Sequence, residues 1–164
     1  MPTVEQYAAQ PRRTRLRRLA LTADELSAAL AGVGADRIGR RPVSDAWAPV
    51  EIVCHLRDSE EWFLVRCQWV LAMNEPAFPR NNPDRWASER QYVRHDATAA
   101  AAAFRRWRDE TLILFRALAD GDWPRGGVHV DGRGRRTLDE FLSVMAWHDD
   151  NHLDQLARAL DGRA

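Results

Sequence analysis

Apolar residues recur at intervals of three and four along four long stretches of this sequence, and no stretch sustains the alternation of a half-buried strand. That spacing places the apolar side chains on one face of a helix. Helices are therefore expected at residues 12–30, 49–74, about 99–118 and 138–159. Four helices of this length in a chain of 164 residues predict an all-α fold, a four-helix bundle.

The segments between these stretches are predicted to be connectors. Three prolines force a loop at residues 74–86. Residues 125–136 are rich in glycine and arginine and predict a turn-rich loop that could close into a short hairpin. Neither an internal repeat nor a change of composition divides the chain. We therefore expect one domain over residues 1–164, with its core in residues 12–160.

Arginine supplies all 24 basic side chains, because the sequence contains no lysine. Schiff-base chemistry, a lysine general base and a Walker-type phosphate lysine are therefore excluded. The 24 acidic residues bring the formal net charge to zero, which weighs against a dedicated nucleic-acid binder. No apolar run is long enough for a signal peptide or a membrane span, and Cys54 and Cys67 lie too far apart on one helix to form a disulfide. We therefore expect a cytoplasmic protein with reduced cysteines and no membrane contact.

The last stretch begins with a T-x-x-E capping box and carries two histidines, His148 and His152, on its apolar seam. Their spacing of four puts both imidazoles on one face. His55 can face inward from the second stretch, so two helices could deliver three imidazoles to one point. Three neutral nitrogen ligands suit zinc, nickel, iron or manganese and leave coordination positions open. The alternative is that each histidine is only hydrogen-bonded to a neighbour. His95 and His129 fall in or near loops, and we expect them at the surface.

Polar residues one turn from these histidines are candidates for orienting a ligand or touching a substrate. Glu51 lies one turn before His55, Ser59 lies one turn after it, and Gln155 lies one turn after His152. Gln155 fits equally well as a polar seam residue that pairs with a neighbouring helix. Three larger side chains complete the pocket candidates: Trp47 and Trp62 as walls, and Arg108 as a partner for an anionic substrate. Core packing of the tryptophans and a surface position for Arg108 are the alternatives, and for Arg108 we expect the surface position.

The segment H-D-D-N-H also bears comparison with the H-E-x-x-H motif of zinc proteases. Asp149 would stand at the glutamate position, but its side chain is one methylene shorter, and the third ligand would come from an upstream helix. We therefore do not expect a protease. Asp150 and Asp154 on the same helix are expected on a solvated face.

Two blocks of this sequence resemble the DinB/YfiT-like superfamily. Residues 47–60, W-A-P-V-E-I-V-C-H-L-R-D-S-E, are similar to the family pattern W-S-x-x-E-I-x-x-H-L-x-D-x-E. Residues 148–156, H-D-D-N-H-L-D-Q-L, are similar to the pattern H-D-x-x-H-x-x-Q-I, and residues 122–138 resemble the family's approach to its last helix. The resemblance covers about residues 16–160. The sequence departs at Ala48, where many relatives have a serine cap, which is worth about 1 kcal/mol.

The resemblance implies a four-helix bundle with a metal at one end of its core, often as a homodimer. It also implies that the metal ligands are His55, His148 and His152, all of which this sequence retains. Characterised branches of the family use low-molecular-weight thiols, as S-transferases or as a maleylpyruvate isomerase, and other members are assigned as metal-dependent hydrolases. We therefore expect an enzyme that acts on a small molecule with a divalent metal, zinc or nickel. An activated water would give hydrolysis, and an activated thiol would give S-transfer.

Two readings from other classes remain open. Residues 12–18 hold five arginines, which could contact nucleic acid. The plainer reading is a solvated helix face that pairs with residues 137–164, where six acidic residues outnumber two arginines, and this is the one that we favour. The second alternative is a metal-binding scaffold or sensor without catalysis.

Overall fold

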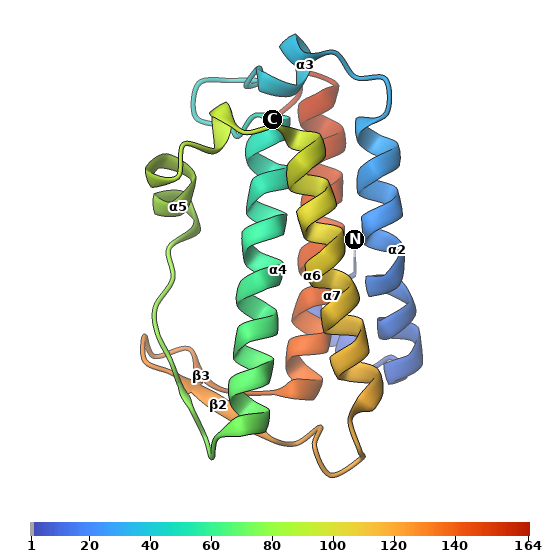
Figure 1. Ribbon diagram of the computed structural model, residues 1–164, viewed down its shortest axis with the longest axis vertical. Helices are drawn as coiled ribbons and strands as arrows, with labels where there is room; N and C mark the ends of the chain where they lie inside the picture. Colours follow the sequence, from blue (N-terminus) through green and yellow to red (C-terminus); the bar gives the residue numbers. More distant parts are fainter. Residues whose placement is uncertain (1) are drawn as a thin grey trace.

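Four long helices dominate the part of the chain that the structure describes, which is residues 2–164 apart from the side chain of Asp84. In this computed structural model the helices are α2 (Arg12–Leu30), α4 (Pro49–Ala72), α6 (Ala97–Ala117) and α7 (Leu138–Leu160) (Figure 1). They pack as a four-helix bundle, which confirms the predicted fold class. Their bounds lie within two residues of the predicted ones at most ends.

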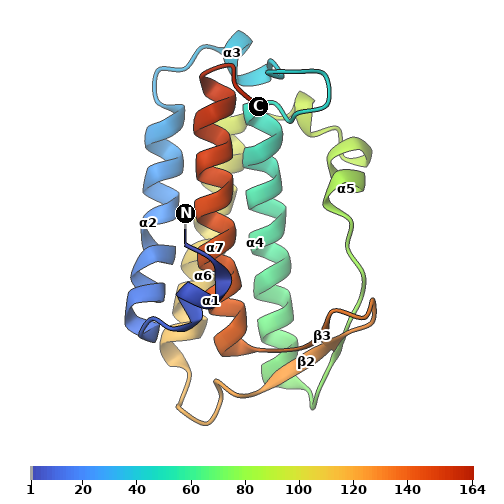
Figure 2. The same cartoon turned by 180° about the vertical axis from the view of Figure 1, so that it is seen from behind.

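The helices do not alternate in direction along the chain. Helices α2 and α7 run one way and α4 and α6 run the other, as the colour gradient in Figure 1 and the reverse view in Figure 2 show. Helix α4 packs against α6 and α7, and α2 packs against the same two helices. Because α4 and α6 are parallel neighbours, the chain must cross the length of the bundle between them. It does so through residues 73–96, along the outside of α4.

Short elements occupy the connectors that the sequence predicted only as loops. The predicted hairpin is present, but the loop at residues 74–86 contains a strand and the start of a helix, which is a correction. A two-residue strand is too short to show a period in the sequence. The short elements are α1 (Val4–Ala8), α3 (Ala35–Gly39), β1 (Ala77–Phe78), α5 (Pro83–Glu89), the 3₁₀ helix η1 (Tyr92–Arg94), β2 (Gly126–His129) and β3 (Gly134–Thr137).

The three strands form a small sheet at the end of the bundle where α4 ends and α7 begins (Figure 2). Strand β2 is central, parallel to β1 and antiparallel to β3. Gly127 allows the close approach of β1 to β2, since a Cβ there would lie 2.4 Å from the ring of Phe78. The sheet thereby joins the crossover to the approach to α7 and places side chains of β2 and β3 beside the bundle.

The bundle core consists of two apolar clusters with a polar layer between them. One cluster includes Leu26, Ile52, Phe104 and Leu156, and the other includes Leu19, Phe115, Phe141 and Met145. Between the clusters each long helix contributes a buried polar residue, and these are Thr22, Glu60, Arg108 and Asp149. A buried polar layer must satisfy its hydrogen bonds internally, so this level of the bundle carries specific contacts rather than general apolar packing.

The arginine-rich start of α2 packs along α7. Arg15 is buried and donates to Asp139 and to Ser143, at 2.7 Å from the serine oxygen. Arg12 also pairs with Asp139, at 2.8 Å, and Arg18 pairs with Asp150, at 2.5 Å. The expected pairing of this face with the acidic last helix is therefore confirmed. Asp150, which we expected to be solvated, lies partly buried in one of these pairs.

No helix within residues 2–164 combines the length with the apolar character that crossing a bilayer requires. Some of the helices begin with a polar side-chain cap. Thr137 and Glu140 form the predicted capping box at the start of α7, since each accepts a hydrogen bond from the backbone N–H of the other. At the start of α4, Ala48 provides no side-chain cap, but its N–H donates to the carboxylate of Glu51 at 2.8 Å.

Candidate metal centre

Three histidines from α4 and α7 meet between the helices. One ligand nitrogen from each of His55, His148 and His152 lies within 4.8 Å of the other two. The Nε2 atoms of His55 and His148 are 3.0 Å apart, and the ring of His152 is centred 4.4 Å from each of the other two rings. The cluster adjoins the polar layer, because His148 directly precedes the buried Asp149 on α7.

The surroundings of the cluster keep all three imidazoles neutral at neutral pH. Burial, with a smaller effect of His152, lowers the pKa of His55 to about 3. Burial also holds the pKa of His148 well below its ordinary value and lowers that of His152. A neutral imidazole offers a lone pair, which a protonated one cannot do. Three lone-pair donors converging from two helices fit a divalent cation that prefers nitrogen ligands.

Neighbouring side chains contact two of the three rings, those of His152 and His55. The amide oxygen of Gln155 lies 2.8 Å from Nδ1 of His152, and when Nδ1–H donates this bond, Nε2 keeps its lone pair. The hydroxyl of Ser59 lies 3.4 Å from Nε2 of His55. Trp47 packs against His55 with the ring centres 5.0 Å apart, and so closes one side of the cluster.

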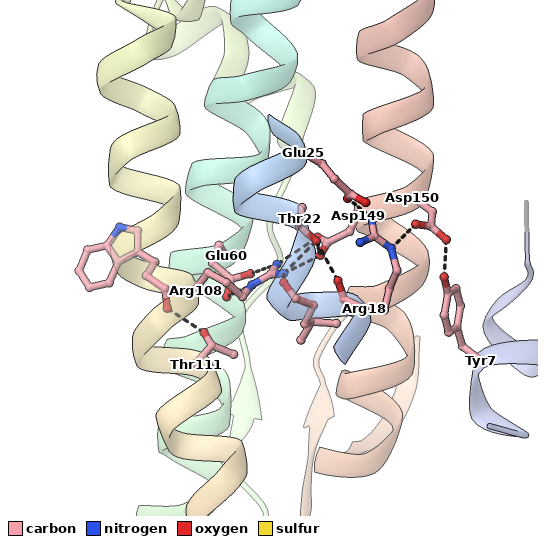
Figure 3. A network of polar contacts seen from close by, with 11 residues as sticks. Tyr7, Arg18, Thr22, Glu25, Glu60, Arg108, Thr111, Asp149 and Asp150 are labelled. Carbon is pink, nitrogen blue, oxygen red and sulfur yellow. Dashed lines mark hydrogen bonds and ion pairs between the residues drawn. The ribbon is translucent and has the colours of Figure 1, made fainter. Parts of the chain in front are cut away.

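A buried ion network centred on Arg108 joins the long helices (Figure 3). The guanidinium donates to Glu60 at 2.7 Å and to Asp149 at 2.6 Å, and only 1% of the arginine is exposed. Thr22 donates to the same carboxylate of Asp149 at 2.6 Å. The expected surface position of Arg108 is therefore wrong. Because both carboxylates already occupy its donors, Arg108 faces the core rather than a substrate, and it fixes α7 at the residue after His148.

Glu51 does not reach the cluster, although the sequence placed it one turn from His55. It is buried at the start of α4, where its carboxylate accepts a hydrogen bond from the N–H of Ala48. Arg41 donates to both of its oxygens, at 2.6 and 2.9 Å. The structure thus corrects the interpretation of Glu51 as a ligand-orienting residue, because its capping role and its ion pair with Arg41 occupy the carboxylate.

A cavity of about 410 Å³ lies beside the cluster and is lined by His55 and His148 but not by His152. It runs between α4 and α7 toward the sheet, and α1 contributes to its wall. His55, His148 and Ser59 lie on its wall together with Trp62, whereas Trp47 does not. A cavity of this volume is in the range that holds a small-molecule ligand. Its remaining walls are formed by Val4, Glu5, Phe63, Arg66, Asn81, Pro83, His129, Arg133, Arg136, Phe141, Val144 and Trp147.

His129 is a functional candidate that the sequence did not predict. We expected a surface residue, but only 5% of it is exposed, because β2 is the central strand and the ring packs edge-on against Phe78 at 5.2 Å. Nothing in the sequence indicated that His129 lies on a central strand. That position depends on the pairing of β2 with β1, which the sequence did not predict. His95 is exposed as expected, beside Arg57 and the backbone of Arg90.

The two cysteines take no part in the site. Cys54 and Cys67 are both free and buried, on different apolar clusters. Burial raises the pKa of Cys54 to about 11 and raises that of Cys67 still further. Neither thiol is therefore a thiolate at neutral pH, and thiolate is the form that attacks or binds a metal.

The bundle brings three neutral imidazoles from two helices together beside a cavity, and this arrangement fits a metal site in a helical core. Comparison with known families identifies it further. The family model of the DinB superfamily matches residues 18–156, which is most of the sequence. The chain therefore belongs to the DinB superfamily.

Individual relatives agree with this family. YfiT of Bacillus subtilis, which is named as a candidate metal-dependent hydrolase, is 25% identical over 107 residues, or 65% of this chain and 60% of YfiT. The chain thus matches less than two thirds of that relative's sequence. The solved structure of YfiT covers 97% of this chain and 88% of its own, with a TM-score of 0.85 and 20% identity. The mycothiol-dependent maleylpyruvate isomerase covers 95% of this chain and 63% of its own, with a TM-score of 0.73 and 15% identity. At these identities the structural matches establish a common fold.

Proposed function

We propose that this protein is a metal-dependent enzyme that hydrolyses a small molecule at a site built on His55, His148 and His152. The observation that carries the proposal is the convergence of three neutral imidazoles, with ligand nitrogens within 4.8 Å, two of which line a cavity of about 410 Å³. A structural staple would close its ligand shell, whereas three ligands beside a cavity leave room for a reactant. The name of YfiT supports the same reaction class.

Several residues at or beside the cavity have a role in this proposal. The three histidines would hold a divalent cation, zinc or nickel, which when bound supplies Lewis-acid activation of a water or thiol nucleophile. Gln155 fixes the tautomer of His152. Ser59, 3.4 Å from His55, can donate or accept a hydrogen bond at the wall where the nucleophile and the substrate meet. Trp62 forms part of the cavity wall.

Transfer of a low-molecular-weight thiol is a second candidate, and the size of the cavity favours it. A volume of about 410 Å³ exceeds what a water and a small acyl group require and leaves room for a thiol cofactor. The mycothiol-dependent isomerase has the same fold. The buried cysteines of this chain cannot supply the thiol themselves, because burial raises their pKa values.

Metal analysis of protein purified without a histidine tag tests the centre. After chelation and incubation with zinc or nickel, wild-type protein should retain about one ion per chain by mass spectrometry of its metals. His55→Ala and His148→Ala should retain none. His95→Ala is the matched control, since His95 is exposed and outside the cluster. Wild-type protein that stays metal-free would contradict the proposal.

Activity screens separate the two reactions. Metal-loaded protein should be incubated with a panel of esters and amides in water, and with an electrophilic arene plus glutathione, bacillithiol or mycothiol. Turnover that a chelator abolishes and added metal restores would support an enzyme, and the productive panel would identify the nucleophile. Metal binding without any turnover would favour the scaffold or sensor alternative.

The partner of this site is proposed to be a small molecule rather than nucleic acid. Three of the five arginines at residues 12–18 are engaged with α7 or with Glu25, which leaves little of that stretch for phosphates. We also propose a homodimer, as the resemblance implies, and light scattering of the purified chain checks it. Absence of a shift with random DNA at low salt would exclude the nucleic-acid reading.

A further inference from the structure

The cavity has a second polar region at the end away from the histidines, and this region is basic. Arg66, Arg133 and Arg136 line it, from α4 and from the β2–β3 hairpin. Arg133 is paired with Asp131 at 2.8 Å. The acidic side chain on the cavity wall is Glu5, which is exposed. Positive charge therefore exceeds negative charge along the described walls.

Arg66 is buried without a carboxylate partner among the described side chains. Only 3% of it is exposed. Its hydrogen bonds go to the carbonyl of Pro79 at 3.3 Å and to the side-chain oxygen of Asn81 at 3.4 Å, which are long and neutral. Its guanidinium lies 4.8 Å from the ring centre of Trp62. By contrast, the buried Arg108 is held by two carboxylates, so Arg66 is a buried cation whose usual counter-ion is missing.

Three residues on this wall each have a buried nitrogen that lacks a hydrogen-bond partner. Nε of Arg66, Nε1 of Trp62 and Nδ1 of His129 have no hydrogen-bond partner among the described residues. All three residues line the cavity. Buried polar groups in native proteins are nearly always satisfied. A cavity wall with such unpaired nitrogens is thus suited to a ligand that brings several acceptor atoms.

The electrostatics of this region agree with the geometry. Burial, with a smaller contribution from Arg133, lowers the pKa of Arg66 to about 10. Burial and the neighbouring arginines likewise lower the pKa of His129 to about 4. Arg66 remains charged at neutral pH, so the folded protein holds a positive charge in unfavourable surroundings. An anion in the cavity would relieve that cost.

We propose that this end of the cavity is a binding site for an oxyanion, a carboxylate or a phosphate, and that the oxyanion forms the end of the substrate remote from the reacting group. The fork of donors on Arg66 matches either group, and Arg136, half-buried and without an ion pair among the described residues, adds a second charge. The location of the reacting group rests on the proposed function, whereas the oxyanion site itself does not.

The spacing along α4 sets the shape of such a substrate. His55 and Arg66 are eleven residues apart on one helix, or about 16 Å along its axis. The arginine side chain shortens this gap by leaning toward the start of its helix. A substrate that reaches both regions is therefore elongated, with its charge at one end and its reactive bond at the other. Binding energy at the charged end would position the bond.

Calorimetric titration with simple anions tests the site. Inorganic phosphate and succinate are added to the folded protein at constant ionic strength, with succinamide as a neutral probe of similar size. At least one anion should bind once per chain, and succinamide should not. Tighter binding of phosphate would indicate a phosphorylated substrate, and tighter binding of succinate a carboxylate. Failure of both anions to saturate would overturn the proposal.

Two variants and a matched control locate the binding. Arg66→Gln and Arg136→Gln should each weaken the anion about tenfold or more. Arg136→Gln keeps the test decisive if Arg66→Gln fails to fold, because the half-buried side chain of Arg136 makes no hydrogen bond or ion pair with a described residue. Arg106→Gln, on the exposed face of α6, should bind as the wild type does. An equal loss in Arg106→Gln and Arg136→Gln would overturn the site.

A metal-free background separates this inference from the proposed function. His148→Ala, which should bind no metal, should still bind the anion with little change in affinity. Retention of anion binding there supports the arginine site even if no metal centre exists. Loss of anion binding in His148→Ala would mean that the anion sits at the histidines, and the arginine site would then be wrong.

Discussion

At the scale of single residues, the candidate site depends on Arg108, which does not line the cavity beside the histidines. It satisfies Glu60 and Asp149 at once, so all three charges stay buried at 1–2% side-chain exposure. Burial of ions is costly, and the attraction repays it only when the geometry is complete. The two carboxylates lower the free energy of the charged guanidinium and raise its pKa. Removal of the arginine alone would leave two carboxylates in the core without a cation.

Arg108→Met should therefore destabilise the protein by about 3–5 kcal/mol, which is typical when one member of a buried ion network is removed. Urea denaturation followed by circular dichroism measures the change in free energy of unfolding. Arg106→Met is the matched control, because Arg106 is exposed two residues away on α6, and its effect should stay within about 0.5 kcal/mol. Equal effects of the two substitutions would show that the network contributes nothing specific.

The residues of this site differed in how visible they were in the sequence. His148 and His152 are predictable because a spacing of four fixes their common face, whatever the rest of the fold. Arg108 was wrongly expected at the surface because its partners lie on two other helices. The sequence alone does not show which residues of different helices lie at the same level along the bundle. His129 was misplaced because its burial depends on a two-residue strand that no periodic pattern announces.

At the scale of elements, α1 shows how a short helix can shape the site. It packs on α7, and its Val4 and Glu5 line the cavity. The hydroxyl of Tyr7 donates to Asp150, which also accepts from Arg18 (Figure 3). The sequence held a signal for this helix, the T-x-x-Q pattern of Thr3 with its reciprocal capping bonds. The apolar spacing did not predict α1, because five residues are too few to show a helical period.

Tyr7→Phe should destabilise the protein at pH 8, and the deficit should shrink above pH 10. Burial and Asp150 raise the pKa of Tyr7 to about 12. The unfolded tyrosine titrates near its ordinary value of about 10. A raised pKa means that the stabilisation is fully present below about pH 10 and is lost as the pH rises through about 12.

Urea denaturation of wild-type and Tyr7→Phe protein at a series of pH values between 8 and 12 measures this effect. Val4→Ala shortens an apolar side chain of the same helix without a titrating group, so its deficit relative to wild type should not vary with pH. A Tyr7→Phe deficit that stays constant up to pH 12 would mean that the hydroxyl makes no bond to a charged Asp150.

At the scale of the whole molecule, the bundle is organised around a polar layer rather than a continuous apolar core. The two apolar clusters could be anticipated from the helical periods of the sequence. Their separation could not be anticipated, because it requires Thr22, Glu60, Arg108 and Asp149 to lie at the same level along the bundle axis on four different helices. The same matching brings His55 level with His148, since α4 and α7 are antiparallel neighbours. The direction of each helix, which apolar spacing does not reveal, thus decides where the site forms.

Because the three histidines come from two helices that are far apart in sequence, metal binding should stabilise the whole bundle. The unfolded chain keeps only His148 and His152 together, so a cation prefers the folded state. A free zinc or nickel concentration about 100 times its dissociation constant should add about 2.7 kcal/mol to the free energy of unfolding. Urea denaturation with added metal and with chelator measures this difference. His95→Ala should show the full effect, and His55→Ala, which leaves the pair on α7 intact, should lose nearly all of it. Equal stabilisation of His55→Ala and wild-type protein would mean that α7 alone binds the ion, and that α4 and α7 do not share a metal centre.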